Sequence, residues 1–255
     1  MKICELFYSI EGEGLWIGLP SAVLRLSGCN RKCAFCDTKF SSWWSNDTED
    51  ITFEEAIKRL SVFPTNRLSI TGGEPLFRPE EELREVVKVI DHFQKRGYQI
   101  KIETNGDIIP DALSVLGIFW SVSPKLAGMG AKEPFNTEAL SRHFYLHPEK
   151  MQLKFVVGSR MTDSTMEADL DQIRTIIMEF PVIKEHQIPV ILQPEGLTEN
   201  LSEYAVRLAD LMERMSFNNN IDVGFWKDIN VRWKDINVRV LPQVHRIAWM
   251  NRRQV

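Results

Sequence analysis

The chain has 255 residues, of which 44% are hydrophobic and 26% are charged, enough for one large α/β domain with a substantial core. A net charge of −4 excludes the broad basic surface typical of proteins that bind nucleic acid or anionic membranes. The N-terminus lacks a signal-peptide pattern, and no stretch approaches the ~18 consecutive apolar residues of a membrane span. We therefore expect a cytoplasmic protein that binds neither nucleic acid nor a membrane.

Strand-like and helix-like segments alternate along the chain. Runs rich in β-branched and aromatic residues predict strands at 2–8, 22–27, 67–71, 99–103, 119–123, 152–157 and 189–193, with one more within 221–240. Amphipathic patterns predict helices at 52–60, 79–96, 169–180 and 201–215, the first opening with a capping box formed by Thr52 and Glu55. This alternation predicts an α/β fold with a mainly parallel sheet and right-handed crossovers, either doubly wound or rolled into an open or closed barrel.

Five of the predicted strands lead into loops rich in glycine and polar residues. In chain order, these loops carry the cysteines of residues 28–38, then Gly72-Gly73-Glu74-Pro75, Thr104-Asn105-Gly106, Ser123-Pro124-Lys125 and Gln193-Pro194-Glu195. Because the active sites of such folds lie at the carboxyl ends of the strands, we expect these loops to form one site.

The first of these loops holds Cys29, Cys33 and Cys36. Three thiolates leave one coordination position open, whereas structural zinc sites and electron-carrying clusters normally have four protein ligands. The spacing alone leaves three other interpretations open: buried core cysteines, a zinc site with a fourth ligand elsewhere, and a redox dithiol. The remaining cysteine, Cys4, lies in an apolar run and is expected in the core.

The second loop, Thr71-Gly72-Gly73-Glu74-Pro75, suits the recognition of an amine. Two glycines let backbone carbonyls approach a cationic amine closely, and Glu74 can orient or accept from that amine. The alternative is an ordinary turn between a strand and a helix.

The two loops together resemble the Cys-x3-Cys-x2-Cys and Gly-Gly-Glu-Pro motifs of radical S-adenosylmethionine (SAM) enzymes, in the same order along the chain. This resemblance implies a partial (β/α)6 barrel whose cluster loop follows the first barrel strand. It also implies a 4Fe–4S cluster on the three cysteines, with SAM chelating the iron that lacks a thiolate.

Other segments resemble one radical SAM family, the 7-carboxy-7-deazaguanine synthases. They are residues 7–14, residues 238–249, and between them Arg25, Cys36-Asp37-Thr38, Glu103-Thr104-Asn105-Gly106 and Ser123-Pro124-Lys125. Because the resemblance covers nearly the whole chain, it implies a single radical SAM domain over 1–255 with family-specific N- and C-terminal segments.

The resemblance implies a lyase that contracts the ring of 6-carboxy-5,6,7,8-tetrahydropterin to give 7-carboxy-7-deazaguanine with loss of ammonia, on the pathway to queuosine. Its cofactors would be the 4Fe–4S cluster, SAM and Mg²⁺. A 5′-deoxyadenosyl radical from SAM would take a hydrogen atom from C6 of the pterin and later receive it back. Expected partners are the small-molecule pterin, an external electron donor such as flavodoxin, and a second copy in a homodimer.

By position, the resemblance also assigns residues to each ligand, with Thr38 as the Mg²⁺ ligand. No side chain is assigned a catalytic role, because the cluster and SAM carry the radical chemistry. The residues assigned to SAM are Phe35, Asp37, Gly73, Glu74, Ser123, Pro124, Lys125 and Gln193. The residues assigned to the substrate are Ile10, Glu11, Gly12, Arg25, Thr71, His245 and Val255.

Two of the residues assigned to the substrate carry opposite charges. These charges suit the two ends of the substrate, a guanine-like edge with hydrogen-bond donors and a carboxylate. A carboxylate at Glu11 can accept from the guanine-like edge of the pterin, and the Arg25 guanidinium can grip the substrate carboxylate. Glu11 departs from the family pattern, which more often has glutamine there, although either side chain accepts from an amine. A salt bridge between Glu11 and Arg25 is the alternative.

Two other functions remain open from the sequence. One is a different radical SAM enzyme, such as a glycyl-radical activase, which would need a partner protein. The other is a zinc-bound module without enzymatic activity. Iron and sulfide analysis of an anaerobic preparation separates the latter.

A tandem duplication interrupts the C-terminal part, where residues 226–232, Trp-Lys-Asp-Ile-Asn-Val-Arg, recur as 233–239. An insertion of seven, an odd number, would turn every downstream side chain of a continuous strand to the opposite face. The second copy leads directly into the family-like terminus. We therefore predict that 236–240 keeps the strand and that 226–232 forms a bulge, loop or hairpin arm.

Overall fold

The computed structural model describes residues 1–34, 36–42, 48–109, 111, 113, 116–129, 135–146, 148–158, 166–196, 200–217 and 235–249. The strands are β1 Lys2–Ile10, β2 Pro20–Leu26, β3 Glu49–Asp50, β4 Arg67–Gly72, β5 Gln99–Thr104, β6 Phe119–Val122, β7 Met151–Val157, β8 Val190–Pro194 and β9 Val238–Val240. The helices are α1 Lys39–Ser42, α2 Phe53–Leu60, α3 Glu80–Gln94, α4 Thr137–Leu146, α5 Met166–Glu179, α6 Val182–Glu185, α7 Leu201–Phe217 and α8 Val244–Trp249. None of these helices combines the length and the apolar character needed to cross a membrane.

The strands form one sheet of nine in the order β3-β1-β2-β4-β5-β6-β7-β8-β9. From β2 to β9 each neighbouring pair is parallel, while β1 is antiparallel to both β2 and β3. Among the described strands β3 and β9 are the two edges, so the barrel is open between them. The mainly parallel sheet and the partial barrel are therefore confirmed.

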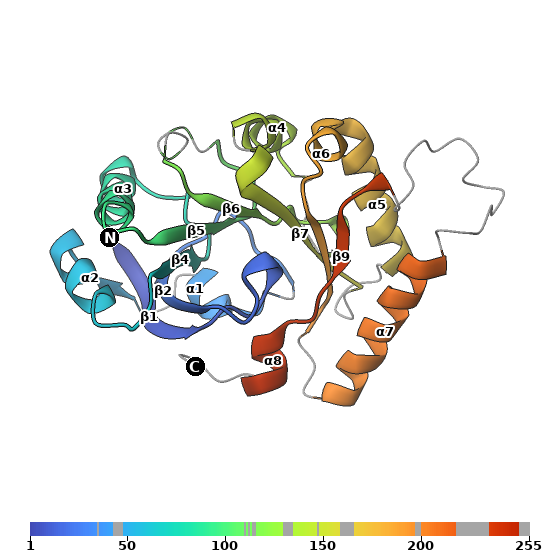
Figure 1. Cartoon of the computed structure of the whole chain (residues 1–255), viewed down its shortest axis with the longest axis horizontal. Coiled ribbons are helices and arrows are strands. Elements are labelled where there is room, and N and C mark those ends of the chain that lie inside the picture. The colour runs from blue at the N-terminus through green and yellow to red at the C-terminus, as the bar shows by residue number, and fades with distance from the viewer. Residues whose placement is uncertain are drawn as a thin grey trace.

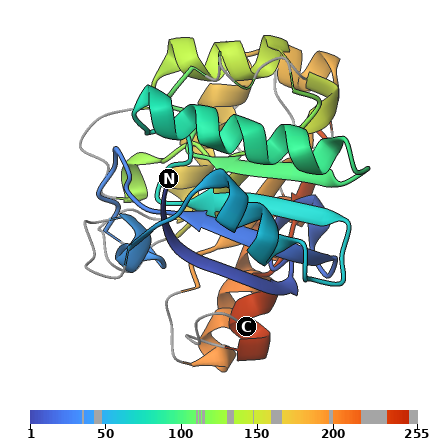
Figure 2. The same ribbon diagram turned by 90° about the vertical axis from the view of Figure 1, so that its left-hand side faces the viewer.

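Helices cover the outside of the curved sheet, from α2 and α3 near its first strands to α5 and α7 near its last (Figure 1). Seen from the edge that carries β1, α7 and α8 lie at the opposite end of the molecule from α3 and α4 (Figure 2). The helix α8 lies on the open side of the barrel, near β1 in space although the two are far apart in the chain (Figure 1).

Side chains alternate between two environments along the parallel strands. On β4, Leu68 and Ile70 are buried in the core, whereas Ser69 and Thr71 line a cavity inside the barrel. The same alternation holds on β2 and β7, where Val23, Arg25, Lys154 and Val156 line the cavity. Parallel strands covered on both faces are normally apolar on both, so charged and hydroxyl side chains on these strands indicate an inner face built to hold polar groups.

The helix α2 begins as the sequence predicts. The Thr52 Oγ1 atom accepts a hydrogen bond from the Glu55 amide at 3.3 Å, which satisfies one of the unpaired amides of the first turn. The helix α3 ends at Gln94, and Gly97 follows with a φ of +78°, a conformation that glycine adopts without strain.

Candidate functional site

A cavity of about 530 Å³ lies at the carboxyl ends of the parallel strands. Its walls come from β1 and the loop after it, the cysteine loop, the ends of β2 and β4 to β7, the segment after β8, and α8. Ligand pockets in proteins commonly measure ~300–1,000 Å³, so this cavity is large enough for small molecules. The predicted site edge is therefore where the structure has its pocket.

Cys29, Cys33 and Cys36 all line this cavity as free thiols. The Sγ atom of Cys36 lies 3.2 Å from the Ser42 hydroxyl and 3.8 Å from the Thr38 hydroxyl. Cys4, by contrast, is half-buried, and its thiol donates to the Phe40 carbonyl at 3.7 Å. The structure thus separates the three loop cysteines from the fourth, but the expectation that Cys4 lies in the core is wrong, because its side chain is only half-buried.

The thiols of this loop suit a metal or cluster. Burial raises the pKa of the Cys29 thiol to about 11 and also raises the pKa of Cys33. Thiolates in such a place need a compensating positive charge, which bound iron supplies. Three thiols facing one cavity, with no fourth cysteine among the described cavity residues, fit a cluster that keeps one iron open.

Gly72 at the end of β4 and Gly73 after it allow the cysteine loop to lie close to the strand. A Cβ atom at Gly73 would lie 2.1 Å from the Gly28 carbonyl oxygen and 2.9 Å from that of Ser41. The same Gly28 carbonyl accepts from the Glu74 amide at 2.8 Å, and the Gly28 amide donates to the Ser41 carbonyl at 2.7 Å. Gly73 is therefore required for the base of the loop to pack here.

Glu74 lies elsewhere than expected. It is fully buried and is not among the described residues that line the cavity. Its carboxylate accepts from the Thr104 hydroxyl at 2.8 Å, the Asn105 amide at 2.7 Å and the Leu76 amide at 3.1 Å. In this structure Glu74 ties the loop after β4 to the loop after β5, and its acceptance from a ligand amine stays a prediction.

Paired charges form part of the cavity wall. Lys101 donates to Glu11 Oε2 at 2.5 Å and to Glu103 Oε1 at 2.9 Å, and Thr71 donates to the other oxygen of Glu103 at 3.0 Å. Burial raises the pKa of Glu103, but Lys101 and Lys154 outweigh it and hold that pKa well below its usual range. Burial lowers the pKa of Lys101, but the carboxylates of Glu103 and Glu11 outweigh it and raise that pKa.

Arg25 has a different partner from the one that the sequence suggested. Its Nε donates to Glu5 Oε2 at 3.0 Å, and its guanidinium lies 5.8 Å from the Phe7 ring and 5.9 Å from the Phe40 ring. Since Glu11 pairs with Lys101 instead, the expected alternative of a Glu11–Arg25 salt bridge is wrong. Both side chains still line the cavity, as their predicted roles require.

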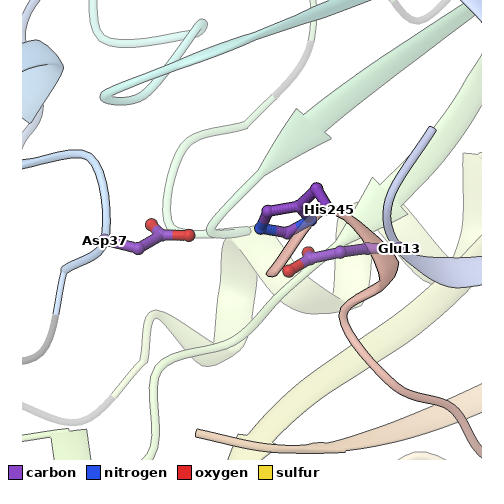
Figure 3. A group of neighbouring side chains, drawn as sticks. All are labelled: Glu13, Asp37 and His245. Atoms are coloured by element: carbon purple, nitrogen blue, oxygen red, sulfur yellow. The ribbon is translucent and has the colours of Figure 1, made fainter. Parts of the chain in front are cut away.

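Glu13, Asp37 and His245 form a third polar group, with ligand atoms all within 4.8 Å of one another. Figure 3 shows Asp37 pointing from the cysteine loop towards the His245 imidazole, with the Glu13 carboxylate beside that ring. Burial raises the pKa of Glu13, but Lys154 and His245 outweigh it and lower that pKa to about 2. Glu13 also pairs with Lys154 and accepts from Gln243.

The approach of α8 explains the glycine at position 12. A Cβ atom at Gly12 would lie 2.2 Å from Nδ1 of His245, and the Gly12 carbonyl accepts from the Val244 amide at 2.9 Å. Without a side chain at Gly12, the C-terminal segment reaches the cavity and brings His245 into its wall.

Most residues predicted from the sequence lie around this one cavity. Those that line it are Ile10, Glu11, Gly12, Arg25, Cys29, Cys33, Cys36, Asp37, Thr38, Thr71, Gly73, Ser123, Lys125 and His245. Pro124 and Gln193 are not among its described lining residues, and Gln193 is fully buried with its amide donating to the Pro242 carbonyl at 3.3 Å. Phe35 and Val255 lie outside the described residues.

Sequence reasoning assigned no role to several charged residues of the wall. They are Glu5, Glu13, Glu103, Lys154 and Glu195, with Lys101 directly behind. The sequence holds one signal for those on strands: Lys101, Glu103 and Lys154 are charged residues in segments that are otherwise apolar. Glu13 and Glu195 lie in loops and carry no such signal.

Comparisons with known proteins agree with this geometry. The family model described as Radical SAM superfamily matches residues 23–118. The chain is 28% identical to a 7-carboxy-7-deazaguanine synthase of Pyrobaculum aerophilum, over 99% of this chain and 96% of that protein. It is 31% identical to the 7-carboxy-7-deazaguanine synthase of Halobacterium salinarum, over 78% of each chain.

A crystal structure of QueE from Escherichia coli has a similar fold, with a TM-score of 0.62 and 21% identity over 96% of this chain and 94% of that one. The similarity of fold therefore covers nearly the whole chain and is not confined to the cysteine loop. By its identity to these relatives along most of their length, the chain belongs to the radical SAM family of 7-carboxy-7-deazaguanine synthases.

Proposed function

We propose that the cavity is the site at which this chain converts 6-carboxy-5,6,7,8-tetrahydropterin into 7-carboxy-7-deazaguanine with loss of ammonia, on the route to queuosine. One observation carries the proposal: three free thiols and a wall of paired charges line the same cavity of about 530 Å³. The thiols suit a cluster, and the charges suit a polar heterocycle that bears a carboxylate.

Cys29, Cys33 and Cys36 would hold the 4Fe–4S cluster. When bound, the cluster and SAM supply the electron and the 5′-deoxyadenosyl radical for hydrogen abstraction from the substrate. The polypeptide positions these groups, because Gly73 leaves room for the cysteine loop and Glu74 fixes the neighbouring loop through Thr104 and Asn105.

The SAM side of the cavity would be formed by Asp37, Gly73, Ser123 and Lys125. All four line the cavity, and the Lys125 ammonium donates to the Ser123 hydroxyl at 2.9 Å. Pro124 and Gln193 would support this wall from behind, consistent with the burial of Gln193.

The substrate side would use both signs of charge. The Oε1 atom of Glu11 is buried and has no hydrogen-bond partner among the described residues, so it is available to a donor on the guanine-like edge of the pterin. Arg25 keeps guanidinium donors beyond the one used by Glu5, and these suit the substrate carboxylate. Ile10, Gly12, Thr71 and His245 complete the lining.

Thr38 would provide an oxygen ligand for Mg²⁺, an ion that takes oxygen ligands and keeps several waters. Its position supports this assignment, because Thr38 lines the cavity beside Asp37, whose carboxylate belongs to the group with Glu13 and His245. Asp37 and Glu13 would then accept hydrogen bonds from the waters of the ion.

We also propose that the enzyme works as a cytoplasmic homodimer and receives its electron from an external protein such as flavodoxin. The cysteines of the cavity are free thiols, and these persist in a reducing compartment. Size-exclusion chromatography with light scattering measures the assembly, and reduction of the cluster by flavodoxin in place of dithionite measures the electron donor.

Anaerobic turnover tests the function directly. The reconstituted protein is incubated with SAM, dithionite, Mg²⁺ and the carboxytetrahydropterin, and the product is identified by mass and absorbance. We expect 7-carboxy-7-deazaguanine from the unmodified chain and from Cys4→Ala, and none from Cys33→Ala, which should remain folded. A fully active Cys33→Ala variant contradicts the assignment of the cluster, and an unmodified chain with full cluster content and no product contradicts the function.

A further inference from the structure

Lys101 is a buried cation in the middle of a strand whose neighbouring residues are apolar. It lies on β5 between Ile100 and Ile102, is 1% exposed, and is not among the described residues that line the cavity. Burial of an ammonium group costs free energy, and an apolar residue would serve strand packing better. A lysine at this position therefore needs a reason beyond stability.

That reason lies in the two carboxylates that Lys101 contacts. Its ammonium donates to Oε2 of Glu11, from the loop after β1, and to Oε1 of Glu103 on β5. It also lies 5.7 Å from the centroid of the Trp16 ring, in the same loop as Glu11. Glu11 and Glu103 both line the cavity, so one buried cation holds two acidic groups of the wall from behind.

In each carboxylate one oxygen accepts a hydrogen bond from Lys101, and the two remaining oxygens have different surroundings. Oε2 of Glu103 accepts from the Thr71 hydroxyl, whereas Oε1 of Glu11 is buried without a partner in the described part of the chain. A buried acceptor without a donor is costly, and a ligand that brings an N–H group removes the cost. Glu11 is thus held in one orientation with one vacant acceptor atom.

The net charge of this group matters as well. Two carboxylates and one ammonium leave a single negative charge, whereas without Lys101 two acidic groups would repel each other in a poorly solvated wall. Two other cations of the wall are engaged by other carboxylates, Lys154 by Glu13 and Arg25 by Glu5.

We propose that Lys101 is a positioning residue that determines specificity: it fixes the Glu11 carboxylate so that its free oxygen selects substrates with an exocyclic amine on the heterocycle. The inference rests on the proposed function, since the pterin is the substrate that brings this amine. Lys101 itself touches no ligand and acts through Glu11.

A double-mutant cycle with Lys101→Met and Glu11→Gln tests this inference. Methionine keeps the length of the lysine without its charge, and glutamine keeps the acceptor oxygen of Glu11 while removing the charge that Lys101 balances. Lys58→Met, on the 81% exposed lysine of α2, is the matched control. For each reconstituted protein we would measure kcat and KM for the pterin, the dissociation constant of SAM, and iron content.

We expect Lys101→Met to raise KM for the pterin about tenfold or more, the effect of a buried carboxylate left without its partner. SAM binding and iron content should stay within twofold of the unmodified chain. Glu11→Gln in the Lys101→Met background should recover most of the loss, because it removes the unbalanced charge. The analogue with a carbonyl group in place of the exocyclic amine should be rejected less strongly by Lys101→Met than by the unmodified chain.

Three results would overturn the inference. The first is an unchanged KM for the pterin in Lys101→Met. The second is a parallel loss of SAM binding and iron content in that variant, which would mark a merely structural role. The third is a folded double variant in which Glu11→Gln does not restore the KM. An unmodified chain that holds cluster and SAM but neither binds nor converts the pterin overturns the proposed function, and this inference with it. Turnover by the unmodified chain together with a normal Lys101→Met overturns this inference alone.

Discussion

Glu13 shows how individual side chains of the site depend on partners that are distant in sequence. Its carboxylate pairs with Lys154, which lies 141 positions away, and accepts from Gln243, which lies 230 positions away. Spacing within a short motif can be read from the chain, so the three cysteines were predictable. Which lysine neutralises which glutamate depends on the register of the whole sheet, so these pairs were not.

The low pKa of Glu13 predicts an acid-dependent loss of stability. Its pKa falls from 4.5 to about 2 in the folded chain, so ionised Glu13 stabilises the fold above about pH 4.5, and this contribution is lost as the pH falls towards 2. The contribution is up to about 3 kcal/mol. The free energy of unfolding in urea, measured on the cluster-free protein between about pH 2 and 4.5, should therefore depend less steeply on pH in Glu13→Gln than in the unmodified chain. Glu54→Gln, on the exposed face of α2, should retain the original dependence, and equal slopes for both variants contradict the prediction.

Thr38→Ala tests the proposed magnesium ligand. Removal of the hydroxyl should lower kcat/KM about tenfold and weaken the dependence of turnover on Mg²⁺, because a coordinating oxygen is lost. SAM binding should change little. Ser41→Ala is a control, because the Ser41 hydroxyl donates to the Thr38 carbonyl at 2.9 Å within the same turn. An unchanged Mg²⁺ dependence in Thr38→Ala removes this residue from the ion.

At the scale of elements, eight of the nine described strands were predictable because they are short runs rich in apolar, β-branched or aromatic residues. The strand β3 was missed, because its two residues, Glu49 and Asp50, carry no such pattern. The strand predicted at 189–193 is observed at Val190–Pro194, and the one expected within 221–240 is β9, Val238–Val240. The helices α1, α6 and α8 were not predicted, because four to six residues carry too little periodicity. The helix α4 was also missed, although Asn136 before it accepts from the Ala139 amide at 3.1 Å, a helix-start signal that the sequence contains.

Gly73→Ala tests how tightly the cysteine loop packs on the end of β4. The new methyl group would meet the Gly28 and Ser41 carbonyls, so the loop must shift and the cysteines with it. We expect iron content per chain to fall by at least half, with about 1–3 kcal/mol of stability lost. Gly97→Ala is the matched control: its φ of +78° is strained for alanine, but nothing lies within 4 Å, so stability should fall without loss of iron.

For the whole molecule, the alternation of strands and helices predicted a mainly parallel sheet, the family resemblance implied a partial barrel, and an open barrel is observed, with a cavity lined by most of the predicted site residues. The cysteine spacing alone could not separate this family from a glycyl-radical activase or a zinc-bound module, because three cysteines on a loop suit all of them. Similarity along the full chain separates them, since it includes residues near both ends. The contact of α8 with Gly12 gives a physical reason, because the C-terminal segment completes the cavity wall.

The duplicated segment gives the last prediction. The first copy, 226–232, lies outside the described residues, while the second copy supplies Ile236, 7% exposed in the core, and the first two residues of β9. The β9 pairing with β8, Val238 opposite Val190, thus belongs to the second copy, and the strand is shorter than the predicted 236–240. The family-like terminus follows this strand without a break.

Deletion of seven residues removes one copy and leaves the same sequence whichever copy is taken. The connection between α7 and β9 becomes shorter, and because loop closure changes by only ~0.6 kcal/mol per doubling of length, stability should be equal or slightly higher. Turnover should stay within a few fold.

In the full chain, Ile236→Asp should destabilise the fold by several kcal/mol because it buries a charge, whereas Ile229→Asp, the matching position of the first copy, should cost much less. Two outcomes would contradict this prediction: an equal loss of folding stability in the two aspartate variants, or loss of folding when seven residues are deleted. Either outcome would show that the first copy is also needed for the fold.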